Sequence, residues 1–316
     1  IKAPLVPVHT WLPDTAEQAT PGTSVLLIGI LDKIGTFGMI KICLTIFPEA
    51  SHWATPVILV WAVVSMFYGA LMALGSPDLL RFVSYTSVSH FGFMVFGVFA
   101  LTTQSLSGSI FYMLNHGFST AAMFLVVGFL VKRRGTAAIE AYGGVQKTAP
   151  VLAGFLLLSG LSVLALPGMS SFVSEFLVMA GSWQRYPVHT AVLTLGMVLA
   201  AAYVLTVYKR TMTGPVPDDV RALMYKVKHA QGTDITRIFD GLNDVRNIIP
   251  SIKWAKEAGM TAQGTLCITT SPVHTLEYYT GIADKLIEAG AEEICLKDMA
   301  GIGQPALLGK LTKAIK

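Results

Sequence analysis

The sequence predicts an all-α bundle of membrane-spanning helices followed by a smaller α/β part. Three observations carry this prediction: long uncharged apolar stretches, an abrupt change in charge content, and strand–helix alternation near the C-terminus. Of the 316 residues, 53% are hydrophobic and 13% are charged, against about 25% charged in an ordinary soluble protein. Residues 1–220 hold 20 charged side chains, and the much shorter 221–316 holds 22. The first part is therefore too apolar for a water-soluble globule.

Stretches without Asp, Glu, Lys or Arg locate the membrane crossings, because a bilayer core of about 30 Å needs roughly 20 apolar residues at 1.5 Å per residue. The longest stretch, 82–131, must cross twice, and polar residues between 102 and 109 supply its turn. About seven crossings are expected. They are 25–47, 56–74, 82–101, 109–131, 150–166, 170–184 and 188–208.

The charges of the loops predict the orientation, since Lys and Arg favour the cytoplasmic side. The 132–149 loop carries four of them and is expected inside, and Arg185 lies in a loop of the same parity. Lys209 and Arg210 conflict with this pattern, because they would lie outside if 167–184 made a full crossing. Either the charge rule or the number of crossings fails at this point.

The first crossing contains Asp32, Lys33 and Lys41. Burying one ionised side chain at mid-bilayer costs about 2.5–3.5 kcal/mol or more. Lys41 lies near the helix end, where its long side chain can reach the interface. Lys33 lies about 12 Å deep at helical rise, where burial destabilises the ammonium and favours a proton relay. The alternative is a structural pair with Asp32, although adjacent side chains diverge around a helix.

Glu175 and His116 are the other candidate proton carriers. Glu175 follows a break at Pro167–Gly168, and non-helical backbone at membrane depth survives where it lines protein or a wet cavity. At least one crossing is therefore broken, and Glu175 is expected to face an aqueous path. His116 lies at a depth comparable with Lys33, so the three groups suit lateral proton movement. His90 is either a packing residue or a further carrier.

Five motifs of the apolar part follow one another in register over about 215 residues. They are Val8-His9-Thr10-Trp11-Leu12-Pro13-Asp14, Ile30-Leu31-Asp32-Lys33-Ile34-Gly35-Thr36, Tyr85-Thr86-Ser87-Val88-Ser89-His90-Phe91-Gly92, Asn115-His116-Gly117, and Leu166-Pro167-Gly168 with Ser174-Glu175-Phe176. This set resembles the subunit M family of respiratory NADH:quinone oxidoreductase (complex I). That family is antiporter-like and is related to the Mrp-type cation/proton antiporters, which remain the alternative.

The resemblance implies a multi-pass subunit of the bacterial inner (plasma) membrane that translocates protons and binds no cofactor itself. NADH, quinone and the redox centres would belong to partner subunits of complex I. The resemblance also implies that Lys33 is the central lysine on a discontinuous helix, His116 a connecting relay group, and Glu175 the acid that ends the half-channel. The family's N-terminal helices are missing, and Leu80 stands where a relay lysine is often found, which leaves the path between Lys33 and His116 undefined.

Beyond a turn-rich linker at 214–220, short apolar runs recur about every 29–30 residues between amphipathic helix patterns. This alternation predicts three βα units of a parallel sheet or TIM-type barrel. Polar residues cluster where each strand ends, the edge at which βα barrels carry their chemistry. Asp240, Thr270 and Lys297 mark the three strand ends.

The motifs Arg237 to Asn247 and Leu296 to Gly301 resemble the carboxyltransferase domain of biotin-dependent enzymes, such as oxaloacetate decarboxylase alpha, transcarboxylase and pyruvate carboxylase. The resemblance implies a divalent metal held by Lys297 together with an aspartate and two histidines. Those partners are missing, so Lys297 is expected to be a remnant ligand without metal or activity. The chain is interpreted as a chimera of residues 1–213 and 221–316, and an inactive fusion is the third hypothesis.

The remaining composition excludes several other classes of protein. A net charge of +4 without a long basic run gives no support for nucleic-acid binding. Cys43, Cys267 and Cys295 are odd in number and far apart, without a CxxC pair. They predict neither a disulfide framework nor an iron–sulfur or zinc site. The resemblance to the complex I family implies other membrane subunits as partners, together with the lipid bilayer.

Overall fold

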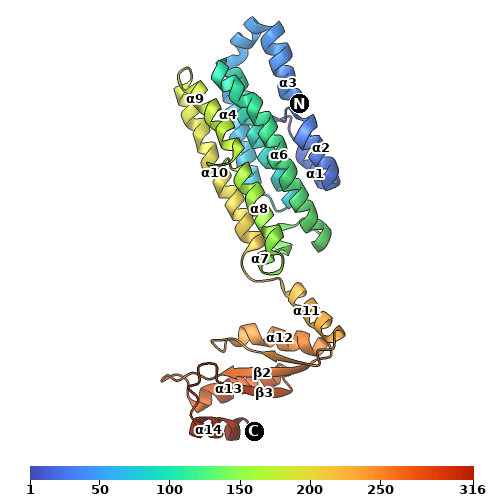
Figure 1. Cartoon of the computed structure of the whole chain (residues 1–316), viewed down its shortest axis with the longest axis vertical. Helices are drawn as coiled ribbons and strands as arrows, with labels where there is room; N and C mark the ends of the chain where they lie inside the picture. Colours follow the sequence, from blue (N-terminus) through green and yellow to red (C-terminus); the bar gives the residue numbers. More distant parts are fainter. The chain divides into compact units, whose positions relative to one another are not determined.

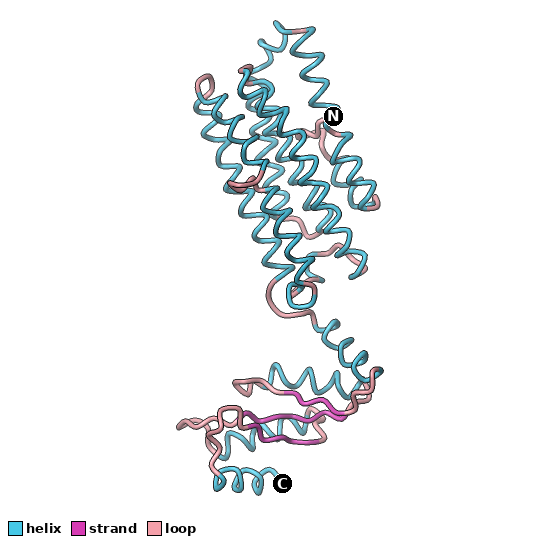
Figure 2. The backbone as a smooth tube through the Cα atoms, in the orientation of Figure 1, coloured by secondary structure: helices cyan, strands magenta, loops and turns pink.

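The structure, a computed structural model, describes all 316 residues and contains two compact units, Ile1–Pro215 and Val216–Lys316 (Figure 1). The first unit is built from helices, and the second combines helices with a small sheet (Figure 2). The first unit opens with a non-helical segment, 1–10. Its helices are α1 (Trp11–Gln18), α2 (Pro21–Leu26), η1 (Leu27–Leu31), α3 (Lys33–Gly38), η2 (Met39–Leu44), α4 (Pro48–Leu74), α5 (Leu79–Phe99), α6 (Thr103–Arg134), η3 (Ile139–Ala141), α7 (Val145–Thr148), α8 (Pro150–Val163), α9 (Ser170–Trp183) and α10 (Pro187–Met212).

Four helices, α4, α5, α6 and α10, are long and apolar enough to cross a membrane. The centre of the bundle is α5, whose span is buried along its whole length by the surrounding helices. Small residues permit this packing: a Cβ on Gly92 of α5 would lie 2.6 Å from the carbonyl oxygen of Ala62 on α4. Removing the side chain at such a position lets two helix backbones approach closely.

The crossing expected at 25–47 is interrupted several times. It consists of α2, the π-helical turn η1, α3 and a second π-helical turn η2. Gly29, Gly35 and Gly38 lower the helix propensity of this stretch, and π turns often mark functional positions inside helices. The discontinuity places Asp32 between η1 and α3, next to Lys33.

The expectation of two crossings at 150–166 and 170–184 is wrong. Helices α8 and α9 have 14 residues each, about 21 Å at helical rise, which is too short to span a bilayer core. Both pack against α6, one after the other: Ser162 Oγ of α8 lies 2.6 Å from Ser119 Oγ, and Ser182 Oγ of α9 lies 3.0 Å from Ser105 Oγ. They are two halves of one broken crossing.

Residues 164–169 form a non-helical turn between the two halves. Ala165 and Gly168 both adopt left-handed backbone angles, with φ of 55° and 105°. The Ser171 hydroxyl on α9 donates to the Ser162 carbonyl on α8 at 2.5 Å, which satisfies one of the carbonyl groups that the end of α8 leaves open. The break is therefore internally hydrogen-bonded, as non-helical backbone inside a membrane must be.

Counting one crossing instead of two removes the conflict in the loop charges. Arg210 Nη2 lies 4.0 Å from Glu140 Oε1, so the end of α10 lies beside the 132–149 loop. The amide of Gly144 also donates to the Thr213 carbonyl at 2.9 Å. Arg185, expected on that side, instead donates to the Leu101 carbonyl at the opposite end of the bundle. The predicted number of crossings was wrong, and Lys209 and Arg210 lie at the same end of the bundle as the 132–149 loop.

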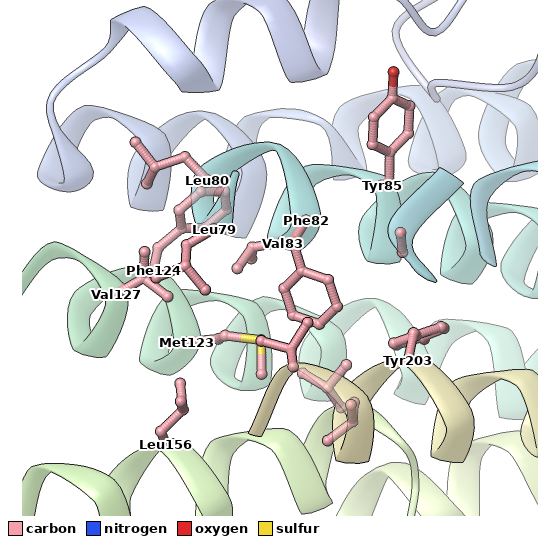
Figure 3. Close-up of a cluster of buried hydrophobic side chains, with 14 of the residues drawn as sticks. Leu79, Leu80, Phe82, Val83, Tyr85, Met123, Phe124, Val127, Leu156 and Tyr203 are labelled. Carbon is pink, nitrogen blue, oxygen red and sulfur yellow. The ribbon is translucent and has the colours of Figure 1, made fainter. Parts of the chain in front are cut away.

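A buried apolar cluster fills the bundle where α5 begins (Figure 3). The side chains labelled there come from α5, α6, α8 and α10, and they include Leu79, Phe82, Phe124, Leu156 and Tyr203. Inside a bilayer such side chains hold the helices together by van der Waals packing, because the surrounding lipid is equally apolar. Polar residues are concentrated further along α5 and α6, where the candidate site lies.

The second unit is a three-stranded parallel sheet with helices. Its elements are α11 (Asp218–Ala230), β1 (Ile235–Ile238), α12 (Val245–Glu257), β2 (Thr261–Cys267), α13 (Leu276–Glu288), β3 (Glu293–Lys297) and α14 (Pro305–Ile315). The strands lie in the order β1-β2-β3, with Ile238 opposite Gly264 and Gly264 opposite Ile294. The strand–helix alternation predicted from the sequence is confirmed, and the three strands do not close into a barrel.

Candidate functional site

Lys33 and Asp32 form a buried ion pair. The Lys33 Nζ lies 2.8 Å from Asp32 Oδ1, and it also donates to the carbonyl of Ile28 at 2.5 Å. Asp32 is fully buried and Lys33 is 8% exposed. The divergence of adjacent side chains assumes α-helical geometry, whereas η1 and the turn at Asp32 bring these two together. Because two charges are removed from water here, losing either partner would leave the other uncompensated.

His116 lies on α6 in contact with His90 on α5. The two ring centroids are 5.2 Å apart in an edge-to-face arrangement. The Nε2 atom of His116 lies 3.2 Å from Thr120 Oγ1, and that of His90 lies 3.2 Å from the Tyr203 hydroxyl. Both Nδ1 atoms are buried without a hydrogen-bond partner. Each imidazole therefore keeps one nitrogen available for a proton or a water molecule.

Glu175 lies on α9, in contact with α6. It is 4% exposed, and the Tyr112 hydroxyl donates a hydrogen bond to its Oε1. Asn115, one helical turn further along α6, donates to the Ser174 hydroxyl at 2.6 Å and to the Ser170 carbonyl at 3.1 Å. These bonds hold α9, the half of the crossing that carries Glu175, against α6 directly after the turn at 164–169.

The three candidate residues do not touch one another, but aromatic side chains connect them. Lys33 Nζ lies 5.2 Å from the ring centroid of Phe91, which lies 5.7 Å from that of His116. His116 in turn lies 6.3 Å from Tyr112, the partner of Glu175. A continuous line of contacts thus runs from α3 through α5 and α6 to α9.

Leu80 lies far from this line. It belongs to the apolar cluster at the start of α5 (Figure 3), and the separation of eleven positions between Leu80 and Phe91 corresponds to about 16 Å of helix. The gap between Lys33 and His116 is therefore filled by the ring of Phe91, and position 80 is not part of it. Lys41 is exposed on η2, away from these groups.

A groove of about 530 Å³ gives a second approach to Lys33. It lies between the α2–η1 segment and α6, and its other lining residues are apolar. They are Val25, Gly29, Ile30, Ile110, Met113, Leu114, Gly117, Phe118 and Ala121. Two helix backbones meet at its base, where a Cβ on Gly117 would lie 2.7 Å from the carbonyl oxygen of Gly29. Lys33 is the one ionisable residue in the lining.

Two tyrosines beside the candidate residues, Tyr112 and Tyr203, were not predicted from the sequence. Tyr112 precedes His116 by one helical turn, so the spacing of these residues on one helix face could have indicated it. Tyr203 comes from α10, 113 residues after His90, and no sequence pattern connects the two. Tyrosine is common in apolar helices, so its presence alone does not identify the tyrosines that make a polar contact.

In the second unit Lys297 is the last residue of β3, and Asp240 and Thr270 lie in the loops that follow β1 and β2. The Nζ of Lys297 lies 3.2 Å from the ring centroid of Phe239, a cation–π contact. A hydrogen bond from the Asn247 side chain, and others from the amides of Asp244 and Leu242, hold the pKa of Asp240 below its ordinary value. The chain contains no group of three or more His, Cys, Asp or Glu residues placed to hold a metal ion.

A bundle of several long apolar helices with ionisable side chains in its interior defines the class of multi-pass membrane proteins. The family described as NADH:quinone oxidoreductase/Mrp antiporter, transmembrane, matches residues 1–200. The chain belongs to this family and is a multi-pass inner-membrane protein.

Relatives of known identity match the same part of the chain. NADH-quinone oxidoreductase subunit M of Mycobacterium tuberculosis is 51% identical over 218 residues, 69% of this chain and 39% of that protein. NADH-ubiquinone oxidoreductase chain 4 of Marchantia polymorpha is 40% identical over 214 residues, 68% of this chain and 43% of the relative. The chain thus spans less than half the length of these relatives.

Two solved structures share the fold. Respiratory complex I from Thermus thermophilus with bound NADH matches with a TM-score of 0.66 at 32% identity, over 68% of this chain and 46% of that chain. The Mrp complex from a Dietzia species matches with a TM-score of 0.64 at 26% identity, over 68% of this chain and 40% of that chain. Both are assemblies of several subunits.

Proposed function

We propose that this chain is the proton-translocating part of a subunit M of NADH:quinone oxidoreductase, with Lys33, His116 and Glu175 as its proton carriers. The observation that supports the proposal is the line of buried contacts that joins these residues through Phe91 and Tyr112. Ionisable side chains inside a membrane are expensive, and they usually mark the pathway of an ion or proton.

The route is a sequence of proton transfers between neighbouring groups. Lys33 holds its proton against Asp32 and releases it toward His116, a step that must pass the face of the Phe91 ring and therefore needs a water molecule beside it. His116 takes that proton on its unpartnered Nδ1. Tyr112 can then give its hydroxyl proton to Glu175 while it receives another from the histidine side.

Asp32 and His90 take secondary roles in this proposal. Asp32 sets how firmly Lys33 holds its proton, because the carboxylate favours the ammonium form. His90 lies between Tyr203 and His116 and offers a branch from the main route. Lys41 is assigned no proton-carrying role, since it is exposed at the end of the crossing.

We propose that the partners are the other membrane subunits of complex I and the lipid bilayer. NADH, quinone and the redox centres would then lie in those partner subunits, and no cofactor would bind here. A Mrp-type antiporter subunit is the second candidate, favoured by the match to the Dietzia Mrp structure. The higher identity to a named subunit M favours complex I.

For the second unit we propose a partial carboxyltransferase barrel joined to the membrane part as a chimera, with a junction at 214–220. The support is limited to the three parallel βα units and to the motif around Lys297. We propose that it binds no divalent metal and has no carboxyltransferase activity. Sequencing of the genomic junction near Asp219 tests the chimera, and two separate reading frames there would dispose of it.

Lys33→Met in the complete subunit of an assembled complex tests the function directly. Inverted membrane vesicles should lose most NADH-driven proton uptake, by about tenfold or more, because a carrier of this kind contributes a large factor to the transfer rate. Lys41→Met is the matched control and should pump normally. Unchanged pumping in Lys33→Met, with the complex assembled, would overturn the proposal.

A further inference from the structure

The sheet of the second unit carries helices on one face and charged side chains on the other. On the first face, Ile238, Ala262 and Leu266 form a buried core with α12, α13 and α14. Successive side chains of a strand point to opposite faces of the sheet, so Arg237 and Gln263 lie on the second face. We call this second face the open face.

A row of three hydrogen-bonded side chains crosses the open face. Arg237 of β1 donates from Nε to Oε1 of Gln263 on β2 at 2.5 Å, and Gln263 Nε2 donates to Oε2 of Glu293 on β3 at 2.8 Å. The three residues are partners in the register of the sheet. Arg237 and Glu293 are both exposed. The row therefore ends in a positive charge on one edge strand and in a negative charge on the other.

A second contact joins the same two edge strands further along the open face. The Nζ of Lys297, the last residue of β3, lies 3.2 Å from the ring centroid of Phe239, which directly follows β1. Because β2 lies between these strands, the contact spans the middle of the sheet. Phe239 remains 45% exposed. The open face thus presents an aromatic ring on its β1 side and an ammonium group on its β3 side.

These two contacts make the open face complementary to itself. A two-fold axis parallel to β2 places β1 of one copy over β3 of another and keeps each residue at the same level along the strands. Arg237 then faces Glu293 of the second copy, Phe239 faces Lys297, and each pair occurs twice, as an isologous interface requires. Sheets that pack face to face lie about 10 Å apart with nearly aligned strands, a gap that such long side chains fill.

Exposed apolar side chains lie beside the charged row. Ile235 belongs to the same face as Arg237, two positions before it on β1, and is 55% exposed. Met299 is 60% exposed, and its Sδ lies 3.9 Å from Sγ of Cys267 on β2. Burial of apolar surface of this kind favours association, whereas complementary charges set the register and exclude wrong partners.

We propose that the open face binds the open face of a second copy of this chain, which gives a two-fold symmetric dimer of the second units. The helices then form the outer layers, and the two sheets face each other inside. This inference concerns association alone and does not depend on the function proposed for the membrane unit. A face of three short strands covers roughly 300 Å², less than the about 800 Å² per partner of a stable interface, so the expected dissociation constant is micromolar.

Reversal of one charge tests the pairing. The full chain in detergent should form a dimer in analytical ultracentrifugation. Arg237→Glu and Glu293→Arg should each raise the dissociation constant by about a hundredfold, because like charges then meet in both copies of the pair. The double variant, Arg237→Glu with Glu293→Arg, restores opposite charges and should recover the dimer. Recovery distinguishes repulsion between charges from misfolding of the single variants.

Cross-linking locates the axis independently. Gln263 lies beside the axis, so Gln263→Cys should be joined to its own copy by a short bismaleimide, in a chain whose Cys43, Cys267 and Cys295 are changed to alanine. Asp284→Cys, at an exposed position of α13 in the helix layer, is the matched control and should stay unlinked. A monomeric wild-type chain, a dimer that both single reversals leave intact, or a double variant that stays monomeric would each overturn the inference. Absence of the Gln263→Cys cross-link would overturn it as well.

Discussion

Tyr112 on α6 donates its hydroxyl hydrogen bond to the Glu175 carboxylate on α9, inside the protein and beside the point where the crossing is broken. Both residues are almost fully buried. The contact joins a group that can store a proton to one that can pass a proton on.

Removing the hydroxyl of Tyr112 should interrupt the route. Tyr112→Phe preserves the ring contacts with His90 and His116 but leaves Glu175 without its donor, a loss of about 1.5–3 kcal/mol for a bond to a charged group. Proton uptake by vesicles should fall by about tenfold if the hydroxyl is a relay. Tyr186→Phe, at a tyrosine outside the cluster, is the control. Normal pumping in Tyr112→Phe would remove Tyr112 from the route.

Neutralising Asp32 should affect Lys33 more than the fold. Asp32→Asn keeps the shape of the side chain but leaves the ammonium of Lys33 without its counter-ion, which costs about 3–5 kcal/mol for a buried pair. Lys33 can avoid this cost by losing its proton, so pumping should fall while assembly is retained. Native gels and proton uptake measured on one membrane preparation separate the two effects. An assembled Asp32→Asn complex that pumps normally would contradict the role given to the pair.

The broken crossing predicts on which side two residues lie. Lys147→Cys and Arg185→Cys should react with a membrane-impermeant maleimide from opposite sides, because α8 and α9 together make the single crossing that separates them. Right-side-out and inverted vesicles provide the two directions of access. Labelling of both cysteines from one side would mean that α8 and α9 are two separate crossings after all.

Lys297→Ala should leave every activity of the chain unchanged. Its side chain contacts Phe239 and lies in no cluster of metal-binding residues, so the expected loss is a surface cation–π contact of about 0.5–1 kcal/mol. Carboxyl transfer from a biotin derivative to pyruvate, assayed with added divalent metal, provides the check. Metal-dependent transfer that disappears in Lys297→Ala would show that the second unit is an enzyme.

Acid should loosen the turn at Asp240. Hydrogen bonds to its carboxylate lower the pKa of Asp240 in the folded chain. The ionised side chain therefore stabilises the fold fully at pH values above the pKa of an unfolded aspartate, about 3.9. The contribution is lost as the pH falls through the lower folded value. Asp240→Asn should therefore reduce the acid dependence of unfolding, followed by circular dichroism of the full chain in detergent. An identical acid transition in both proteins would exclude this contribution.

Ionisable side chains in apolar stretches singled out Lys33, His116 and Glu175 as candidates from the sequence, because such side chains are rare there. The pairing of Lys33 with Asp32 could not be predicted in the same way, since it depends on π turns that no regular helical period describes. The contact between His90 and Tyr203 joins helices that are distant in the chain. Sequence periodicity locates helices, but it does not say which faces meet.

The prediction of the number of crossings was wrong for a related reason. Two apolar segments separated by Pro167 and Gly168 look the same whether the chain reverses between them or continues in one direction. Only the successive contacts with α6, at Ser119 and then at Ser105, decide between these alternatives. Arg185 was predicted at the wrong end of the bundle because of that single error.

The interruption of this crossing also has a mechanical consequence. An unbroken helix is a stiff rod, so a force applied at one end tilts the whole of it. Here the turn at 164–169 divides the crossing into α8 and α9, and each half is fastened to α6 by its own serine contact. Glu175 therefore lies on a segment of only 14 residues, so a shift of this segment need not tilt the half on the other side of the turn.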